Sequence, residues 1–493
     1  MRILGPVAMR TAPTGWPTTV RLRARRVWDR AVRSAPTRVR AAVAAAVVLT
    51  FALCAVLAVA VRDARAGVDL VGHHSGPVVV STSNLYFALA DMDAQVANIL
   101  LVGARTDLGV TRTGALATYE RRRAEVNGYL QQTAAYAGRD PAAGRDLRSV
   151  LDALGRYHGL AAQSIMAESQ TTALAGRPPP PALDLYRQAT DVMHDHLLPA
   201  ALRLTDDEVA QVEHEYADAR SAAGTATGWV AVLGLALLAV LVVLQVMLAR
   251  DHHRMVNPAI AVATLGVLGL LVTGLSTVTG AEEHLRVAKE EAFDYAVALH
   301  QARAVGYDAN ADERRYLVDP DRAARYEAAF HAKSQQIVRT DAAGVAEYDR
   351  ALAVGLDAYN ADHRTVTFDG FLGHALRHTA FAGDRAVDER VLTRYQAYQA
   401  ADRRIRALNT SGDLEAAIRF CTSVAPGGSS ALFAEYDAAL GDLIAINERA
   451  FGDAVTASDH TLAGWAWPPP VVAVVVALLV LVGAAPRLAE YRG

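Results

Sequence analysis

The residues best suited to chemistry lie in the second half of the chain, where acidic and amide side chains alternate. Asp308, Asn310 and Asp312 occupy every second position, and Glu313 follows them directly. Oxygen ligands at this spacing begin the calcium-binding loop of an EF-hand. That loop needs glycine at its sixth position and glutamate at its twelfth, where this chain has Glu313 and Asp319. A polar helix face is therefore favoured over a cation or ligand site.

We expect this acidic strip to take part in association, and it consists of Asp308, Asn310, Asp312 and Glu313. On a helix, Asp308 and Asp312 share one face, and Arg315 lies two turns from Asp308. About 28 helical residues after Gly280 would carry the strip more than ~30 Å along the helix axis. It could then meet a binding protein or the other outer bundle, whereas the alternative is that it forms salt bridges within its own bundle.

Other candidate sites are weaker. His374 and His378 are spaced to share a helix face, but no third metal ligand is evident. His194 and His196 flank Asp195 at a spacing that does not share a helix face. The chain has no phosphate-binding loop, nucleophile elbow, zinc-protease motif or dinucleotide-binding motif. We therefore predict that the chain is not an enzyme and has no catalytic residue, cofactor or metal.

Two arginine clusters complete the list of candidates. One is Arg121 to Arg123, and the other is Arg403, Arg404 and Arg406 after Asp402. A solvated helix face is the simplest interpretation of both, although an acidic partner could use the second cluster.

The elements that must position these residues include four long stretches with almost no charge. About 20 apolar residues, at 1.5 Å each, span a hydrocarbon core of about 30 Å. The first stretch could be a signal peptide, because Ala64-Arg65-Ala66 resembles a cleavage site. Its apolar core of about 23 residues is too long for one, so we expect an uncleaved anchor. The expected spans are 39–61, 228–249, 258–280 and 465–486.

The charges are segregated between the connecting segments. Residues 1–40 contain ten Arg and one acidic residue, whereas 62–227 contains 15 basic and 20 acidic residues, and 281–465 contains 20 and 29. By the positive-inside rule, both termini lie in the cytoplasm and both long segments lie outside the cell membrane. The basic N-terminus favours contact with anionic lipid over nucleic acid. The cytoplasmic segments are too short to hold a kinase or a DNA-binding domain.

Both outer segments have the pattern of helical bundles. Apolar residues recur at 3/4 spacing, as in Leu85, Leu89, Met92, Val96 and Ile99, and strand signals are almost absent. Glycine and proline breakers divide the first segment into helices near 79–102, 115–137, 142–174 and 182–221, and the second into four main helices with one or two short ones. The resulting all-α prediction is a cytoplasmic tail (1–38), four spans, a first bundle (62–227), a cytoplasmic loop (250–257), a second bundle (281–464) and a short tail (487–493).

The two halves resemble a distant duplication. Each consists of a span, a long outer segment and a second span. Asp91-Met92-Asp93 leads to Leu100-Leu101-Val102 in the first half, and Asp308 to Glu313 leads to Tyr316-Leu317-Val318 in the second.

The layout and three phrases of the chain resemble a known family. The phrases are 185–194 (LYRQATDVMH), 307–313 (YDANADE) and 402–408 (DRRIRAL). Together with the order of elements over about 39–486, they are similar to the actinobacterial GlnX-type membrane proteins. More distantly, an outer helical bundle joined to spans resembles the sensor domain of bacterial chemoreceptors.

The GlnX-type resemblance implies a connection between an amino-acid-binding lipoprotein of the GlnH type outside and a soluble serine/threonine kinase of the PknG type inside. We therefore expect a non-enzymatic signal relay with these two partners, no nucleic acid and a possible homo-oligomer. The alternatives are a direct small-molecule sensor that needs no lipoprotein, and a structural or accessory envelope protein. A channel or carrier is disfavoured, because the cores of the four spans lack ionisable residues.

Overall fold

The chain is all-α, as the sequence predicts. The computed structural model describes residues 35–137, 141–250, 257–377, 385–465 and 467–490. The structure is 88% helical and these ranges contain no strand, only an isolated bridge between Arg339 and Asp369. The described residues form two compact units. The span unit comes from 1–63, 222–279 and 462–493, and the bundle unit from 64–221 and 280–461.

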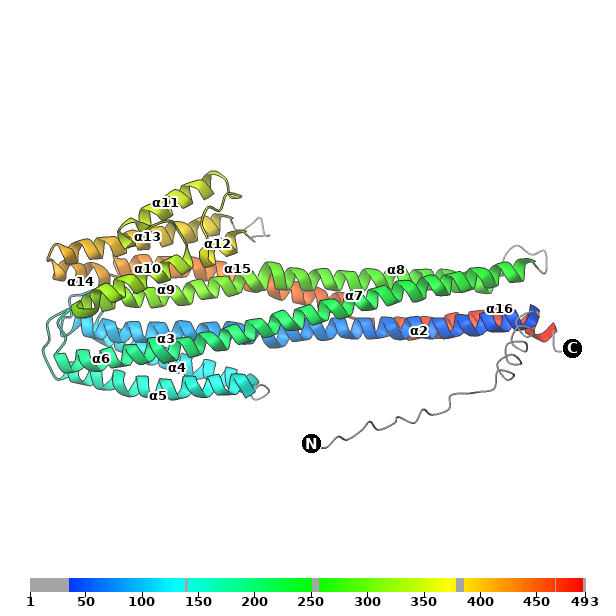
Figure 1. Cartoon of the computed structure of the whole chain (residues 1–493), viewed down its shortest axis with the longest axis horizontal. Helices are drawn as coiled ribbons and strands as arrows, with labels where there is room; N and C mark the ends of the chain where they lie inside the picture. Colours follow the sequence, from blue (N-terminus) through cyan, green and yellow to red (C-terminus); the bar gives the residue numbers. More distant parts are fainter. Residues whose placement is uncertain (1–34, 138–140, 251–256, 378–384, 466, 491–493) are drawn as a thin grey trace, which may run out of the picture. The chain divides into compact units, whose positions relative to one another are not determined.

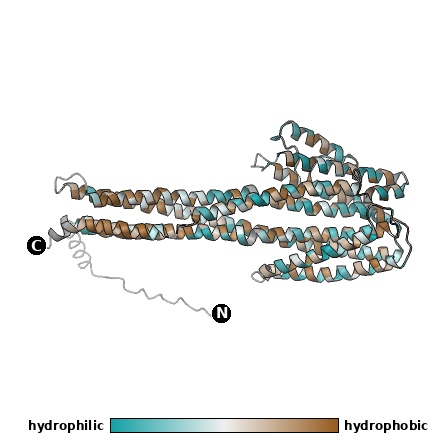
Figure 2. Cartoon of the chain, turned by 180° about the vertical axis from the view of Figure 1, so that it is seen from behind, coloured by the Kyte–Doolittle hydropathy of each residue, from teal (hydrophilic) through white to brown (hydrophobic). Residues whose placement is uncertain are grey.

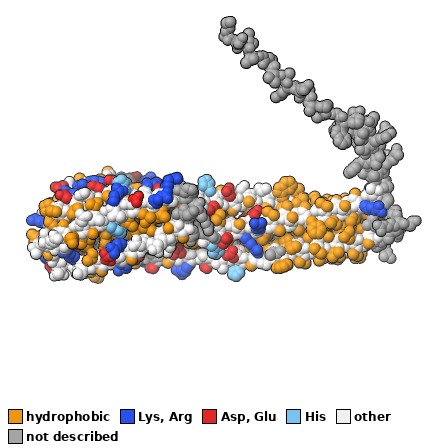
Figure 3. Space-filling model, turned by 90° about the horizontal axis from the view of Figure 1, so that it is seen from below, with side chains coloured by type: hydrophobic (Ala, Val, Ile, Leu, Met, Phe, Trp, Pro, Cys, Tyr) orange, Lys and Arg blue, Asp and Glu red, His pale blue; other side chains and the backbone are white. Residues whose placement is uncertain are grey.

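The span unit contains the apolar stretches. Its helices are α2 (Ala35–Asp69) up to Asp63, the last part of α7 (Leu198–Arg250), most of α8 (Pro258–Arg286) and α16 (Pro468–Glu490). Gly234 allows α7 to approach α8 closely, because a Cβ there would lie 2.3 Å from Leu271. Hydrophobic residues cover these helices in Figures 2 and 3. Val48, Leu235 and Leu265 are each at least 66% exposed, as expected for side chains that contact lipid.

Five helical stretches of the described chain are long and apolar enough to cross a membrane, as judged by length and composition. Four of them overlap the predicted spans. The fifth, Pro77–Val102, has 89% of its most apolar window buried inside the bundle unit. A helix covered by protein on all sides is a core helix rather than a span. These features are consistent with a membrane protein.

The first half of the bundle unit follows the predicted breaks closely. After a π-helical segment, η1 (Leu70–Ser75), its helices are α3 (Gly76–Val102), α4 (Arg112–Ala137), α5 (Pro141–Ser169) and α6 (Pro180–Val192). A second π-helical segment, η2 (Met193–Leu197), leads directly into α7. The expected apolar residues of α3 are buried in the core, among them Leu85, Leu89, Met92, Val96 and Ile99.

The second half contains more and shorter helices than predicted. It begins with η3 (Val287–Phe293), a π-helical segment placed as η1 is in the first half. The helices that follow are α9 (Asp294–Val318), α10 (Ala323–Ile337), α11 (Val345–Ala361), α12 (Gly370–Arg377), α13 (Arg385–Thr410), α14 (Leu414–Thr422) and α15 (Ser429–Leu462), with a 3-10 turn, η4 (Pro320–Arg322), before α10.

The two outer segments pack together within the bundle unit, whereas the sequence analysis treats each as a bundle of its own. Helices α3 and α9 lie side by side (Figure 1). One hydrophobic core contains residues of both halves, including Leu89 and Tyr186 from the first and Leu317 and Ile418 from the second. The α3–α9 contact therefore brings residues about 220 positions apart in the sequence into one site.

Candidate functional site

The acidic strip lies on α9 and is buried. Asp308, Asn310, Asp312 and Glu313 are each at most 3% exposed. The strip is thus not exposed, because α9 is covered by other helices of the bundle unit. The side chains meet the first half of the unit as well as their own, so a separate protein would reach them only if the helices moved apart.

Asp308 and Asp312 belong to a buried charge cluster, which we define as Asp93, Asp308, Asp312, Arg315 and Lys333. Arg315 donates from Nη2 to Asp93 Oδ2 at 2.6 Å, and from Nη1 to Asp312. Lys333 Nζ lies 2.7 Å from Asp308 Oδ2 and 2.5 Å from Asp312 Oδ2. Helices α3, α9 and α10 supply these residues, so the cluster joins the two halves of the unit.

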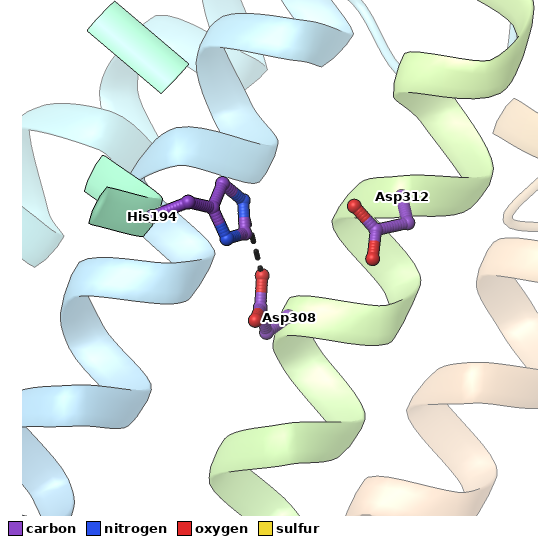
Figure 4. Close-up of side chains that lie close together, drawn as sticks. All are labelled: His194, Asp308 and Asp312. Carbon is purple, nitrogen blue, oxygen red and sulfur yellow. Dashed lines mark ion pairs between the residues drawn. The ribbon is translucent and has the colours of Figure 1, made fainter. Parts of the chain in front are cut away.

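The distances between their side chains would allow three residues to hold a metal ion together: His194, Asp308 and Asp312. Their ligand atoms all lie within 4.8 Å of one another, and Figure 4 shows the imidazole directed at Asp308. His194 Nε2 and Asp308 Oδ1 are 3.7 Å apart. However, Lys333 already bridges both carboxylates, and an ammonium group there provides the charge that a cation would supply. The donor set therefore fits an internal ion cluster better than a metal site.

The electrostatics of the cluster keep His194 neutral. The pKa of His194 is lowered to about 4, mainly by burial; Asp308 opposes this shift, and the positive charges of Arg315 and Lys333 add to it. Burial alone would raise the pKa of Asp308, but the positive charges of Lys333 and Arg315 outweigh it and hold the pKa well below its usual range. Two basic groups, Arg315 and Lys333, thus contact the three carboxylates of the cluster.

The neighbouring tyrosines stay protonated. Tyr157 donates to Asp93 at 3.0 Å, and Tyr186 lies 3.5 Å from the same carboxylate. Burial raises the pKa of both phenols well above the usual range. Both hydroxyl groups therefore remain hydrogen-bond donors that help to stabilise the buried Asp93 charge.

Acidification should destabilise the bundle unit through His194. The imidazole has a pKa of about 4 in the folded chain and 6.5 when it is free in water, so the unfolded chain binds more protons between these values. This contribution is complete above pH 6.5 and is lost as the pH falls toward 4, by up to about 3 kcal/mol. Urea unfolding of the full chain at pH 7, 5.5 and 4.5 measures it. A His194→Gln variant should show a flatter profile, and an unchanged slope would contradict the assignment.

The remaining residues of the strip form a second polar group. Glu313 accepts hydrogen bonds from Ser429 Oγ at 2.7 Å and from Cys421 Sγ at 3.3 Å. Arg314 donates from Nε to Asn98 Oδ1 at 2.6 Å and also contacts Asn310. The strip thus divides in two: Asp308 and Asp312 contact Arg315 and Lys333, whereas Glu313 contacts α14 and the start of α15 and Asn310 contacts Arg314.

Further ion pairs join the two halves near the ends of α6 and α9. Arg187 donates from Nε to Asp319 Oδ2 at 2.9 Å and lies 2.8 Å from Asp321. Arg322 lies 3.0 Å from Asp191. Sequence analysis did not identify Arg187 or Lys333 as site residues. One feature of the sequence could have drawn attention to Lys333: lysine is rare in this chain, which has only two lysines among 49 basic residues.

The other sequence candidates have structural partners or lie apart. Arg122 pairs with Asp91 at 2.5 Å, and Arg403 pairs with Asp349 at 2.8 Å. Arg406 pairs with Asp402, whereas Arg404 stacks over the ring of Phe420. His374 lies on α12, and His378 lies outside the described residues. Asp195 and His196 are exposed. The structure does not bring these residues together with the buried charge cluster.

A known protein family matches the first half of the bundle unit. This half contributes Asp93, Arg187 and His194 to the contacts described above. Residues 67–217 match the family model of the actinobacterial sensor domain. The match covers α3 to α6 and the first part of α7, which we call the sensor-domain segment. It indicates a sensing or signalling role. No curated protein and no solved structure matches the chain.

Proposed function

We propose that the chain is a non-enzymatic relay that carries an extracytoplasmic cue to a cytoplasmic serine/threonine kinase. The cue would be amino-acid availability, reported by a solute-binding lipoprotein. The observation that carries this proposal is the sensor-domain segment, present in a chain with helices of membrane-spanning length. The resemblance to GlnX-type proteins supplies the two partners.

The charge segregation supports the orientation of this relay. The Arg-rich N-terminus favours the cytoplasm, and the two acidic segments favour the outside. With both termini inside, the cytoplasmic segments are short and basic, so the output would need a separate protein. A kinase that docks on these segments would fill that role.

The packing of the two halves supports a mechanism for the relay. The halves are held together by ion pairs, of which Arg315–Asp93 is fully buried and Arg187–Asp319 lies nearer the surface. A partner that binds one packing of the halves better than another would shift the population toward it. Because α2, α7 and α8 contribute residues to both units, a change in the packing of the halves would be carried into the spans.

Two variants with matched chemistry test this proposal in living cells. Arg187→Met removes a pair between the halves, whereas Arg203→Met removes the pair with Asp146 inside the first half, 3.2 Å long. We expect only Arg187→Met to change phosphorylation of the kinase substrates after amino-acid addition, in a strain whose own gene is deleted. The measurement is phosphopeptide abundance by mass spectrometry.

The control is a membrane blot that shows equal amounts of both variants. If deletion of the gene leaves the phosphorylation response intact, the relay proposal is wrong and a structural or accessory envelope role is favoured. If both variants respond as the wild type does, the halves do not carry the signal.

A further inference from the structure

A cavity lies on one side of the α3–α9 contact, inside the bundle unit. It has a volume of about 80 Å³. Both halves contribute to its wall, with α3 and α7 on one side and α9, α10 and α12 on the other. The lining residues are Ser83, Tyr86, Leu202, Thr205, Gln301, Ala304, Val305, Gln336 and Phe371.

Elsewhere along the α3–α9 contact, aromatic and charged side chains pack against one another. There the guanidinium groups of Arg122 and Arg303 lie 4.4 Å and 4.7 Å from the centre of the Phe87 ring. Tyr307 packs edge-on against Phe87 with ring centroids 4.4 Å apart, and Asp437 on α15 pairs with Arg303 at 2.6 Å. The contact between the halves thus includes both close packing and a cavity.

One polar group of the cavity wall has no partner within the protein. Ser83 is only 4% exposed, and its hydroxyl has no hydrogen-bond partner among the described residues. The hydroxyl of Thr205 donates to Ala201 O at 3.3 Å, which leaves its oxygen free to accept. Buried hydroxyl groups are nearly always hydrogen-bonded to protein, water or ligand. Ser83 is thus suited to bind a polar atom placed in the cavity.

The wall also defines the charge and the size of a ligand. None of the nine lining residues is ionised near neutral pH, so an ion would lose hydration without gaining a counter-charge. Leu202, Ala304, Val305 and Phe371 offer apolar contact. An engineered apolar cavity of about 150 Å³ holds one benzene molecule. A volume of about 80 Å³ therefore fits only a few heavy atoms.

We propose that this cavity binds a small uncharged molecule with a short apolar body and one hydrogen-bonding group, such as a short alcohol. The body contacts Leu202, Ala304 and Phe371, and the polar group pairs with Ser83. Tyr86 links the cavity to the buried charge cluster, because it lines the cavity and its hydroxyl lies 3.5 Å from Asp308 Oδ2. A ligand there contacts both halves and stabilises their packing. This consequence rests on the proposed function, whereas the binding itself does not.

Fluorine NMR on the full chain in nanodiscs at pH 7 tests the binding with three probes of similar size. These are trifluoroethanol, which is neutral, 3,3,3-trifluoropropylammonium, a cation, and trifluoroacetate, an anion. We expect protein to increase the transverse relaxation rate of trifluoroethanol only. Ser83→Ala should weaken its affinity about three- to tenfold through loss of one hydrogen bond.

Two tryptophan variants control for partition into lipid. Leu202→Trp adds an indole at the partly exposed rim of the cavity and should abolish the relaxation increase, whereas Val354→Trp adds one at a site that is 71% exposed and should not. Ser81→Ala, which removes a hydroxyl bonded to Gln132, should leave the affinity unchanged.

If the wild type and Leu202→Trp increase the relaxation rate of trifluoroethanol equally, the probe does not bind at this site. If the wild type does not change that rate, the cavity holds only water and the proposal is wrong. Equal effects of the charged probes would overturn the ligand class. Since these measurements need no kinase or lipoprotein, failure of the relay leaves them unaffected.

Discussion

Replacing Arg315 with methionine is expected to lower the free energy of unfolding of the bundle unit by about 3–5 kcal/mol. Arg315 and Asp93 are both fully buried, and the variant leaves the Asp93 carboxylate without its counter-charge. Asp312 would lose a partner too. All five tryptophans lie outside 64–221 and 280–461, so unfolding is best followed by far-UV circular dichroism of the full chain in urea.

A double-mutant cycle separates the pair from its surroundings. Asp93→Asn combined with Arg315→Met should be less destabilised than the sum of the two single variants, because no uncompensated Asp93 charge remains. Arg404→Met serves as the control, since Arg404 is exposed and stacks on Phe420. If Arg315→Met unfolds at the same urea concentration as the wild type, the buried pair does not hold the halves together.

Leu89→Asp is expected to cost about 4 kcal/mol or more, because it places an unpaired charge in the core of the bundle unit. Leu89 is fully buried on α3, in the core that contains residues of both halves. Leu89→Ala should cost about 2–5 kcal/mol, since it removes only apolar contacts. Urea unfolding monitored at 222 nm measures both changes.

The matched control is Val354→Asp, where the same side chain replaces a valine that is 71% exposed. This variant should remain within about 0.5 kcal/mol of the wild type. A Leu89→Asp variant that unfolds together with Val354→Asp would show that α3 is not a core helix of the unit.

The helices could be predicted because their signals are local. Leu85, Leu89 and Met92 recur at helical spacing, and each is buried on α3 as expected. The helix ends expected near Gly103 and Gly138 also follow from local signals, the glycines themselves. The helix near 182–221 and the span 228–249 were expected to be separate, but α7 continues through Gly224 and Gly228 to Arg250. An isolated glycine lowers helix stability only modestly, and packing compensates for it.

The environment of the acidic strip could not be predicted because its partners are distant in sequence. Asp308 and Asp312 are spaced correctly for one helix face, but nothing near them indicates that Asp93 or His194 lies opposite. Charged residues are rarely buried unless paired, so the sequence alone left salt bridges within the bundle and contact with another protein both open. Only the packing of α3 against α9 shows that the pairs exist. Whether a separate protein also binds Asp308, Asn310, Asp312 and Glu313 remains a prediction.

The reactivity of the Lys333 amine can report on the conformation of the bundle unit. The two lysines, Lys289 and Lys333, both have short contacts to carboxylates, to Asp294 and to Asp308 and Asp312. Lys333 is ion-paired with two carboxylates and its side chain is only 14% exposed, so acylating reagents reach its amine poorly. Acylation of Lys333 would therefore report on separation of α9 from α10. A peptide map locates the acylated lysine, so no engineered probe is needed.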